Sequence, residues 1–117
     1  MISWGHTEIF VRDPVKSKEF YEKILGFELV EIQNDKFIWL KLGTNIFLLR
    51  PGENKLIAEE YKNTNTGFVL YTGDLEKTKQ ELISRGLKFS GTDGSDKCPT
   101  FKDPDGNWFQ LVNPEQH

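Results

Sequence analysis

The residues of this sequence that could do chemistry are few, and most of them fall in short apolar segments. His6 and Glu8 stand two positions apart at the start of one such segment, so on a strand their side chains share a face. A neutral imidazole can bind a transition metal or accept a proton, and a carboxylate can do the same. The spacing therefore predicts a small polar site, in which His6 or Glu8 contacts a ligand or serves as a general base. A histidine that is merely hydrogen-bonded at the wall of a cleft remains an alternative.

A second candidate lies near the C-terminus, where a turn precedes a strand. Asp103-Pro104-Asp105-Gly106 has the composition of a turn, because proline presets φ and glycine accepts a positive φ. Trp108–Val112 then alternates around one polar residue, which predicts a strand with Trp108, Gln110 and Val112 on one side. For Gln110, a ligand contact and a satisfied amide packed beside Trp108 are equal alternatives.

The elements that must position these residues can be predicted from capping and periodicity. Asp13-Pro14 opens a helix and Gly26 ends it, while Asp74 opens a second helix that Gly86 ends. One helical turn is also expected around residues 56–61. The expected strands cover residues 7–11, 27–33, 36–42, 46–50, 68–72, 87–90, 97–102 and 107–112.

These elements occur twice in the same order, which indicates an internal repeat. Asp13 aligns with Asp74 at an offset of roughly 61 residues, and Gly26 aligns with Gly86 when one residue is dropped. Each half reads as strand, helix and three strands. Because a module of roughly 60 residues can barely bury a core, two modules are expected to pair.

Composition excludes several classes of protein. The chain has 117 residues and a net charge of −3 with no long basic run, so nucleic acid is a poor partner. It contains no apolar run of the roughly 20 residues that a membrane helix needs, and no signal-peptide pattern. A single cysteine, Cys98, cannot form an internal disulfide and suits a reducing, cytoplasmic location; we expect it to be structural.

Three motifs carry a resemblance to a known family. They are Val11-Arg12-Asp13, the run from Phe20 to Phe27 (FYEKILGF), and Asp103-Pro104-Asp105-Gly106-Asn107. With them the chain resembles the vicinal oxygen chelate superfamily, which includes glyoxalase I, extradiol dioxygenases, fosfomycin resistance transferases and bleomycin resistance proteins. The resemblance implies an α+β fold, in which two βαβββ modules in tandem curl their sheets around a shared cleft. It implies one domain over residues 1–117, with module one at about 1–51, a linker at about 52–66 and module two at about 67–114.

The resemblance also implies where a metal would be held. In metal-using members the ligands come from the first and last strand of each module, and these positions are His6, Leu48, Gly67 and Gln110 here. Of these only His6 is an ordinary ligand, whereas many members have a histidine in place of Gly67 and a glutamate in place of Gln110. Two neutral ligands fall short of the three that a catalytic zinc site uses. We therefore expect no cofactor, with a divalent metal at His6 and Gln110 as the alternative.

Three functions follow from these expectations. The first is a metal-independent protein that sequesters an apolar or aromatic small molecule, as bleomycin resistance proteins do. The second is a metal-dependent lyase or transferase of the glyoxalase or fosfomycin resistance type. The third is a metal-free enzyme with His6 or Glu8 as general base. The side chains expected to contact the ligand are His6, Glu8, Phe10, Leu48, Arg50, Tyr71, Trp108 and Gln110.

The resemblance further implies a homodimer. In similar two-module proteins the cleft is built across the subunit boundary, so His6 of one chain would face Gln110 of the other. Partly open sheets also leave strand edges and apolar faces that a second copy can cover. The predicted partners are therefore a small molecule and a second copy of the chain, with neither nucleic acid nor membrane.

Overall fold

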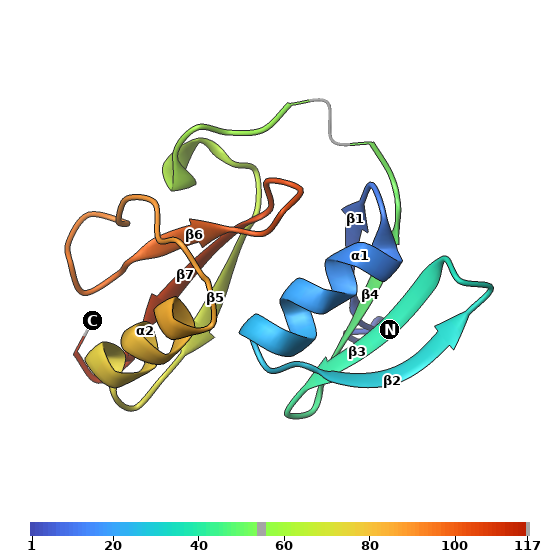
Figure 1. Ribbon diagram of the computed structural model, residues 1–117, viewed down its shortest axis with the longest axis horizontal. Helices are drawn as coiled ribbons and strands as arrows, with labels where there is room; N and C mark the ends of the chain where they lie inside the picture. Colours follow the sequence, from blue (N-terminus) through green and yellow to red (C-terminus); the bar gives the residue numbers. More distant parts are fainter. Residues whose placement is uncertain (54–55, 117) are drawn as a thin grey trace. The chain divides into compact units, whose positions relative to one another are not determined.

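The computed structural model describes residues 1–53 and 56–116, and the chain divides into two compact units, Met1–Lys55 and Leu56–His117. Among these described residues, each unit contains one sheet and one α-helix, and Figure 1 labels them. The predicted α+β class and the tandem arrangement of two similar units are therefore confirmed. Within the described residues, no helix has the length and apolar character required to cross a membrane.

Unit 1 is built on a four-stranded sheet. Its elements are β1 (Thr7–Val11), α1 (Pro14–Glu19), the π-helical turn η1 (Phe20–Ile24), β2 (Glu28–Gln33), β3 (Phe37–Leu42) and β4 (Asn45–Pro51). The strand order is β1-β4-β3-β2, with β1 parallel to β4 and the other pairs antiparallel. Strand β1 therefore forms one edge of the sheet, hydrogen-bonded to a strand that starts 34 residues after β1 ends.

The first helix begins and ends where the sequence predicts. The Asp13 carboxylate accepts a hydrogen bond from the Lys16 amide at 3.2 Å, and Pro14 occupies the first helical turn. The helix continues through η1, and Gly26 follows with φ +79°, a conformation that only glycine adopts without strain.

The alternation of side chains separates the two faces of this sheet. Ile9, Ile38 and Leu49 lie on one face at adjacent register positions and are fully buried. Helix α1 packs against β3 and β4, and Tyr21 at its end is completely buried, with its ring 5.4 Å from that of Phe27. The polar residues of β1 and β4 therefore lie on the opposite face of the sheet.

Unit 2 is built on a three-stranded sheet. Its elements are the 3₁₀ turn η2 (Tyr61–Asn63), β5 (Gly67–Tyr71), α2 (Leu75–Ser84), β6 (Thr100–Lys102) and β7 (Trp108–Val112). The strand order is β5-β7-β6, with β5 parallel to β7 and β6 antiparallel to β7. Helix α2 is capped by Asp74, whose carboxylate accepts from the Lys77 amide at 3.1 Å, and Gly86 follows it with φ +106°.

Two strand predictions in unit 2 need correction. Residues 87–90 form no strand, and the strand expected over 97–102 covers only Thr100–Lys102. The Ser90 amide donates to the Thr100 carbonyl at 2.7 Å, but Gly91 then takes φ +75° and turns the chain away from an extended path. Pro99 also lacks a backbone N–H group that could donate to a neighbouring strand. The single helical turn expected around residues 56–61 is instead η2, displaced towards the C-terminus.

The turn before β7 is held by one carboxylate. Asp103 Oδ1 accepts from the amides of Asp105 and Asn107 at 2.9 and 2.8 Å, and its Oδ2 accepts from Asn107 Nδ2 at 2.9 Å. Gly106 completes the turn with φ +90°. Because Asp103 is buried and satisfies two backbone donors, it holds the turn that leads into β7.

Candidate functional site

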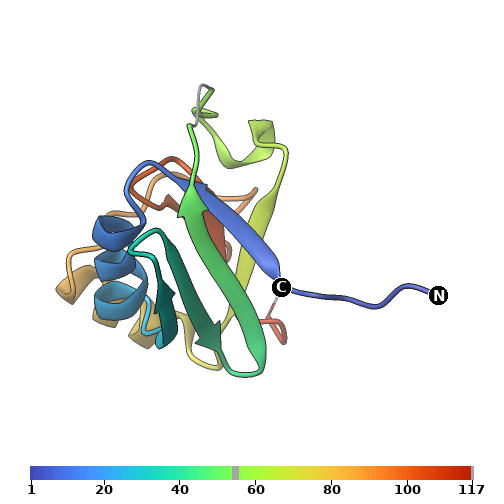
Figure 2. The same ribbon diagram turned by 90° about the vertical axis from the view of Figure 1, so that its right-hand side faces the viewer.

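Three charged or polar side chains meet on the face of the unit 1 sheet that points away from α1. His6 Nε2 lies 2.8 Å from Glu8 Oε2, and Arg50 Nη1 donates to Glu8 Oε1 at 2.8 Å. β1 and β4 bring them together, because Glu8 is paired with Leu48 and Phe10 with Arg50 in their parallel register. Figure 2 shows the chain running from the N-terminus to β1 as an extended segment. The predicted shared face of His6 and Glu8 is thus observed, and we call these three residues the His6–Glu8–Arg50 cluster.

Aromatic rings surround this cluster. The His6 ring meets Trp39 edge-on with centroids 4.9 Å apart, while the Arg50 guanidinium lies 5.3 Å from the ring centroid of Phe10 and 5.7 Å from that of Phe37. Contacts of this kind hold a guanidinium in place, so the fold sets the direction of its remaining N–H donors. The surroundings of the cluster are therefore apolar and aromatic, which is the usual composition of a small-molecule site.

The electrostatics of the cluster favour an ionised Glu8. The hydrogen bond from Arg50 is the main cause of a lowered Glu8 pKa, and the hydrogen bond with His6 adds to it. Both partners are about one-third exposed, so water also reaches the pair. A carboxylate in this state accepts hydrogen bonds from His6 and Arg50 at the same time and orients the imidazole.

Leu48 and Phe10 differ in exposure although both lie on this face. Leu48 is only 4% exposed, because Glu8 and Trp39 flank it on the neighbouring strands. Phe10 is 44% exposed and packs near Arg50 and Gly52. Phe10 is therefore partly exposed on this face, whereas Leu48 is buried within it.

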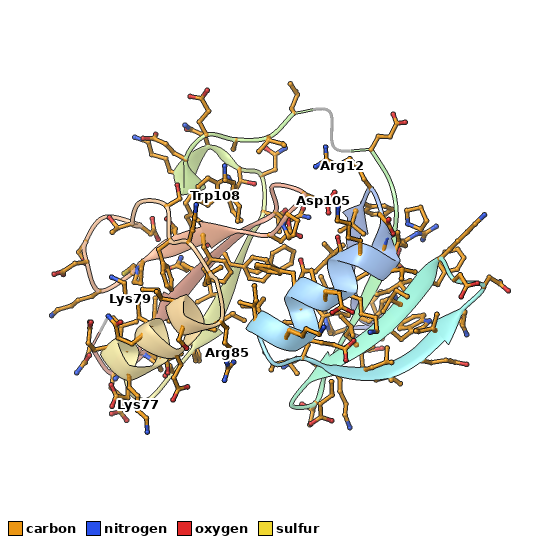
Figure 3. All side chains as sticks on the ribbon, in the orientation of Figure 1. Arg12, Lys77, Lys79, Arg85, Asp105 and Trp108 are labelled. Atoms are coloured by element: carbon orange, nitrogen blue, oxygen red, sulfur yellow. The ribbon has the colours of Figure 1, made fainter. Side chains whose placement is uncertain are left out.

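In unit 2, Gln110 and Trp108 are both occupied by contacts with their own unit. Gln110 Nε2 donates to the Tyr61 hydroxyl at 3.0 Å and to Asp93 Oδ2 at 3.1 Å. Trp108, labelled in Figure 3, donates from Nε1 to the Ala58 carbonyl at 2.8 Å. The amide nitrogen of Gln110 is thus hydrogen-bonded within unit 2, while its Oε1 is buried with no donor among the described residues. Tyr71 lies two strand positions from Val69 on β5 and is 72% exposed.

Tyr61 is the functional candidate that sequence reasoning missed. A Cβ added to Gly67 would lie 2.5 Å from Tyr61 Cζ, so the tyrosine occupies the space in which a side chain at position 67 would begin. Ile57 similarly occupies the space beside Gly106, with Cγ2 2.6 Å from an added Cβ. The available signal was a glycine at the start of a strand, which marks a close approach by another group. Residues 57–61, expected in a linker, therefore lie against the sheet of unit 2.

The donor set does not fit the metal that the fold family implies. Of the four positions carried over by resemblance, Leu48 and Gly67 have no donor atom and Gln110 directs its amide nitrogen to Tyr61 and Asp93. His6 is the only ordinary ligand, and the Glu8 beside it is bound to a cationic arginine. Among residues 1–53 and 56–116, no group of three His, Cys, Asp or Glu side chains is placed to hold a metal ion.

Comparisons with solved structures show what the chain is similar to. Lactoylglutathione lyase from Agrobacterium tumefaciens matches with a TM-score of 0.73 at 16% identity, covering 97% of this chain and 95% of that one. The fosfomycin resistance protein FosX from Mesorhizobium loti matches with a TM-score of 0.71 at 19% identity, covering 96% and 92%. FosX from Listeria monocytogenes, solved with Mn(II) and sulfate, matches with a TM-score of 0.75 at 15% identity, covering 97% and 91%. At these identities the likeness concerns the fold.

Sequence comparison identifies the family. Among curated proteins, none matches the chain. The profile of the Glyoxalase/Bleomycin resistance protein/Dioxygenase superfamily, however, matches residues 3–111, which is nearly the whole sequence. Its range takes in the FYEKILGF run, the turn held by Asp103, and all of both sheets except Val112, the last residue of β7. The chain therefore belongs to the Glyoxalase/Bleomycin resistance protein/Dioxygenase superfamily.

Proposed function

We propose that this protein binds an apolar or aromatic small molecule on the unit 1 face that carries the His6–Glu8–Arg50 cluster, and that it does so without a metal ion. The single observation that supports this is the combination of a half-exposed aromatic ring, Phe10, with a hydrogen-bonded cluster of both charges. A planar ligand would stack on the aromatic surface, and its polar groups would be oriented by Arg50 and His6. The donor set, with one ordinary metal ligand, supports metal independence.

Binding of the fluorescent aromatic probe 8-anilinonaphthalene-1-sulfonate tests this proposal. The unmodified protein should bind one equivalent in the presence of EDTA, and Phe10→Ala should weaken binding several-fold because it removes stacking area. Val15→Ala is the matched control, because Val15 is 47% exposed on α1, against 44% for Phe10. Equal affinity for the two variants, or loss of binding in EDTA, would contradict the proposal.

A second candidate function is catalysis by a metal-free enzyme with His6 as general base. The observation that favours it is the 2.8 Å contact between His6 Nε2 and Glu8, because a carboxylate hydrogen-bonded to an imidazole fixes the orientation and the tautomer of the ring. His6→Asn would remove the base, and Glu8→Gln would keep the shape while removing the charge.

Turnover assays separate this candidate from binding alone. Two suitable first substrates, given the structural neighbours, are the hemithioacetal of glutathione and methylglyoxal, and fosfomycin with either water or a thiol as the nucleophile. Turnover that is lost in His6→Asn and reduced in Glu8→Gln would support an enzyme. Turnover that requires added Mn²⁺ would instead support the metal-dependent lyase or transferase, the remaining alternative.

A further inference from the structure

A tryptophan lies in the middle of the sheet face that carries the His6–Glu8–Arg50 cluster. Trp39 is on β3, and the register pairs it with Leu48 of β4 on one side and with Glu31 of β2 on the other. Leu48 is paired in turn with Glu8 of β1, so one row of side chains crosses all four strands. The indole is half-buried and meets the His6 ring edge-on at 4.9 Å. Part of the Trp39 ring is therefore exposed next to the cluster.

A bulge in β2 turns polar side chains towards this face. Before the bulge, Leu29 is paired with Leu40. Continued without a shift, this antiparallel register would pair Glu31 with Ile38, which is buried on the opposite face. The register shifts between Leu29 and Glu31, however, so that Glu31 is paired with Trp39. Bulges re-aim side chains and are over-represented next to functional sites, and this one directs the polar end of β2 towards the cluster.

Two side chains of β2 hold the tryptophan through a chain of hydrogen bonds. Trp39 Nε1 donates to Gln33 Oε1 at 3.0 Å, and Gln33 Nε2 donates to Glu31 Oε2 at 3.3 Å. Both partners determine the orientation of the Gln33 amide, because an indole N–H only donates and an ionised carboxylate only accepts. The Trp39 ring is therefore fixed by Gln33 at its nitrogen and packs against the His6 ring as well.

We propose that Trp39 is the surface on which the ligand stacks and that Gln33 is the positioning residue that fixes its ring. This inference rests on the function proposed for the cluster face, and it adds a second aromatic contact to Phe10. An indole offers a larger flat surface than a phenyl ring. Because its N–H group already donates to Gln33, a ligand that covers the indole leaves no donor without a partner. A ring that is fixed before binding also loses less conformational freedom when the ligand arrives.

Titration with 8-anilinonaphthalene-1-sulfonate in EDTA tests both residues. Trp39→Leu should weaken binding about tenfold, because it removes the stacking surface. Gln33→Met keeps the length of the side chain but removes the acceptor, so the indole is no longer fixed and binding should weaken about threefold to tenfold. Gln80→Met is the matched control and should leave the affinity unchanged. Gln80 also donates to a glutamate, Glu76, at 3.4 Å, but it lies on α2 of unit 2.

An exchange of the two β2 residues separates positioning from a change in composition. In the double variant Glu31→Gln with Gln33→Glu, the carboxylate at position 33 accepts from Trp39 Nε1 and the amide at position 31 donates to that carboxylate. The net charge and the chain of hydrogen bonds are both retained. This variant should bind the probe as tightly as the unmodified protein, although Gln33→Met does not.

Proton NMR of the ligand-free protein shows whether Gln33 acts through the tryptophan ring. The His6 ring lies 4.9 Å from the Trp39 ring, so the chemical shifts of the His6 ring protons depend on the orientation of the indole. These shifts should change in Gln33→Met and should stay at their original values in the double variant and in Gln80→Met. A role of Gln33 that did not involve the indole would leave the His6 resonances of Gln33→Met unchanged.

The results distinguish a failure of this inference from a failure of the proposed function. If the unmodified protein does not bind the probe in EDTA, the proposed function is wrong and this inference is wrong with it. If Phe10→Ala weakens binding but Trp39→Leu does not, only the role of Trp39 is overturned. Equal affinities of Gln33→Met and Gln80→Met, weak binding by the double variant, or unchanged His6 shifts in Gln33→Met would each overturn the role of Gln33.

Discussion

Tyr61 stands in the space that a side chain on Gly67 would need. A Cβ at position 67 would lie 2.5 Å from Tyr61 Cζ and 2.9 Å from Cε1, both well inside van der Waals contact. The same tyrosine accepts a hydrogen bond from Gln110. The two positions at which the resemblance implies metal ligands in unit 2 are therefore engaged by one aromatic side chain from the segment before β5.

The first prediction concerns this contact. Gly67→Ala should destabilise the protein by about 1–3 kcal/mol, because the added methyl group must displace Tyr61 from its hydrogen bond. In a Tyr61→Leu background the same substitution should cost much less, which a double-mutant cycle by urea unfolding would measure. Gly73→Ala is the control, since an added Cβ at Gly73 meets nothing within 4 Å. Equal costs of Gly67→Ala in both backgrounds would show that Tyr61 is not the obstacle.

The second prediction concerns the pH dependence of the His6–Glu8–Arg50 cluster. Glu8 should titrate below its ordinary pKa of 4.5 in the folded protein, because Arg50 and then His6 stabilise its charged form. A pKa that is lower in the folded than in the unfolded state stabilises the fold above the unfolded-state value. That contribution is lost as the pH falls through the folded-state value. Carbon-13 NMR of the Glu8 carboxyl should therefore give a midpoint below 4.5.

Removal of the arginine checks the cause of this shift. Arg50→Gln should raise the Glu8 midpoint towards its ordinary value, while Arg85→Gln, in unit 2, should leave it unchanged. If the Glu8 midpoint is the same in both variants, the hydrogen bond from Arg50 is not what lowers the pKa.

The third prediction concerns the end of the first helix. Gly26 has φ +79° and an added Cβ would meet no atom within 4 Å, so the only penalty for a side chain is backbone strain. Gly26→Val should destabilise the protein by about 1–2 kcal/mol. Gly5→Val is the control, because Gly5 also has open space around it and lies outside the positive-φ set. Chemical unfolding that gives the same midpoint for both variants would contradict the assignment.

The fourth prediction is that the protein forms a homodimer through β5. This strand is an edge of its sheet and exposes Val69 and Tyr71, at 47% and 72%. Exposed apolar edge strands pair readily with another chain. Sedimentation should give a dimer at micromolar concentration, and Tyr71→Lys should shift it towards monomer. Ile83→Lys is the control, because Ile83 lies on α2 at 43% exposure, and this variant should remain a dimer. If the unmodified protein sediments as a monomer, the prediction is wrong.

The sequence by itself determined the local elements and their faces. Asp13 and Asp74 cap helices because each carboxylate accepts from an amide only three residues along the chain. Gly26 and Gly86 end the helices because each takes a positive φ, which depends on the residue itself. The alternation of strand side chains likewise placed His6 and Glu8 on one face without knowledge of any other strand. These features depend only on neighbours along the chain, so they could be predicted from it.

Only the tertiary structure decided which distant residues complete the site. Arg50 reaches Glu8 across 42 positions, and Tyr61 reaches Gln110 across 49, through contacts that require the strand order and the path of the preceding segment. The prediction of a strand at residues 87–90 was wrong for the same reason, because the pairing of this segment depends on how Gly91 turns the chain. The strength of such contacts is set by register and packing between distant segments, which residue type and spacing do not specify.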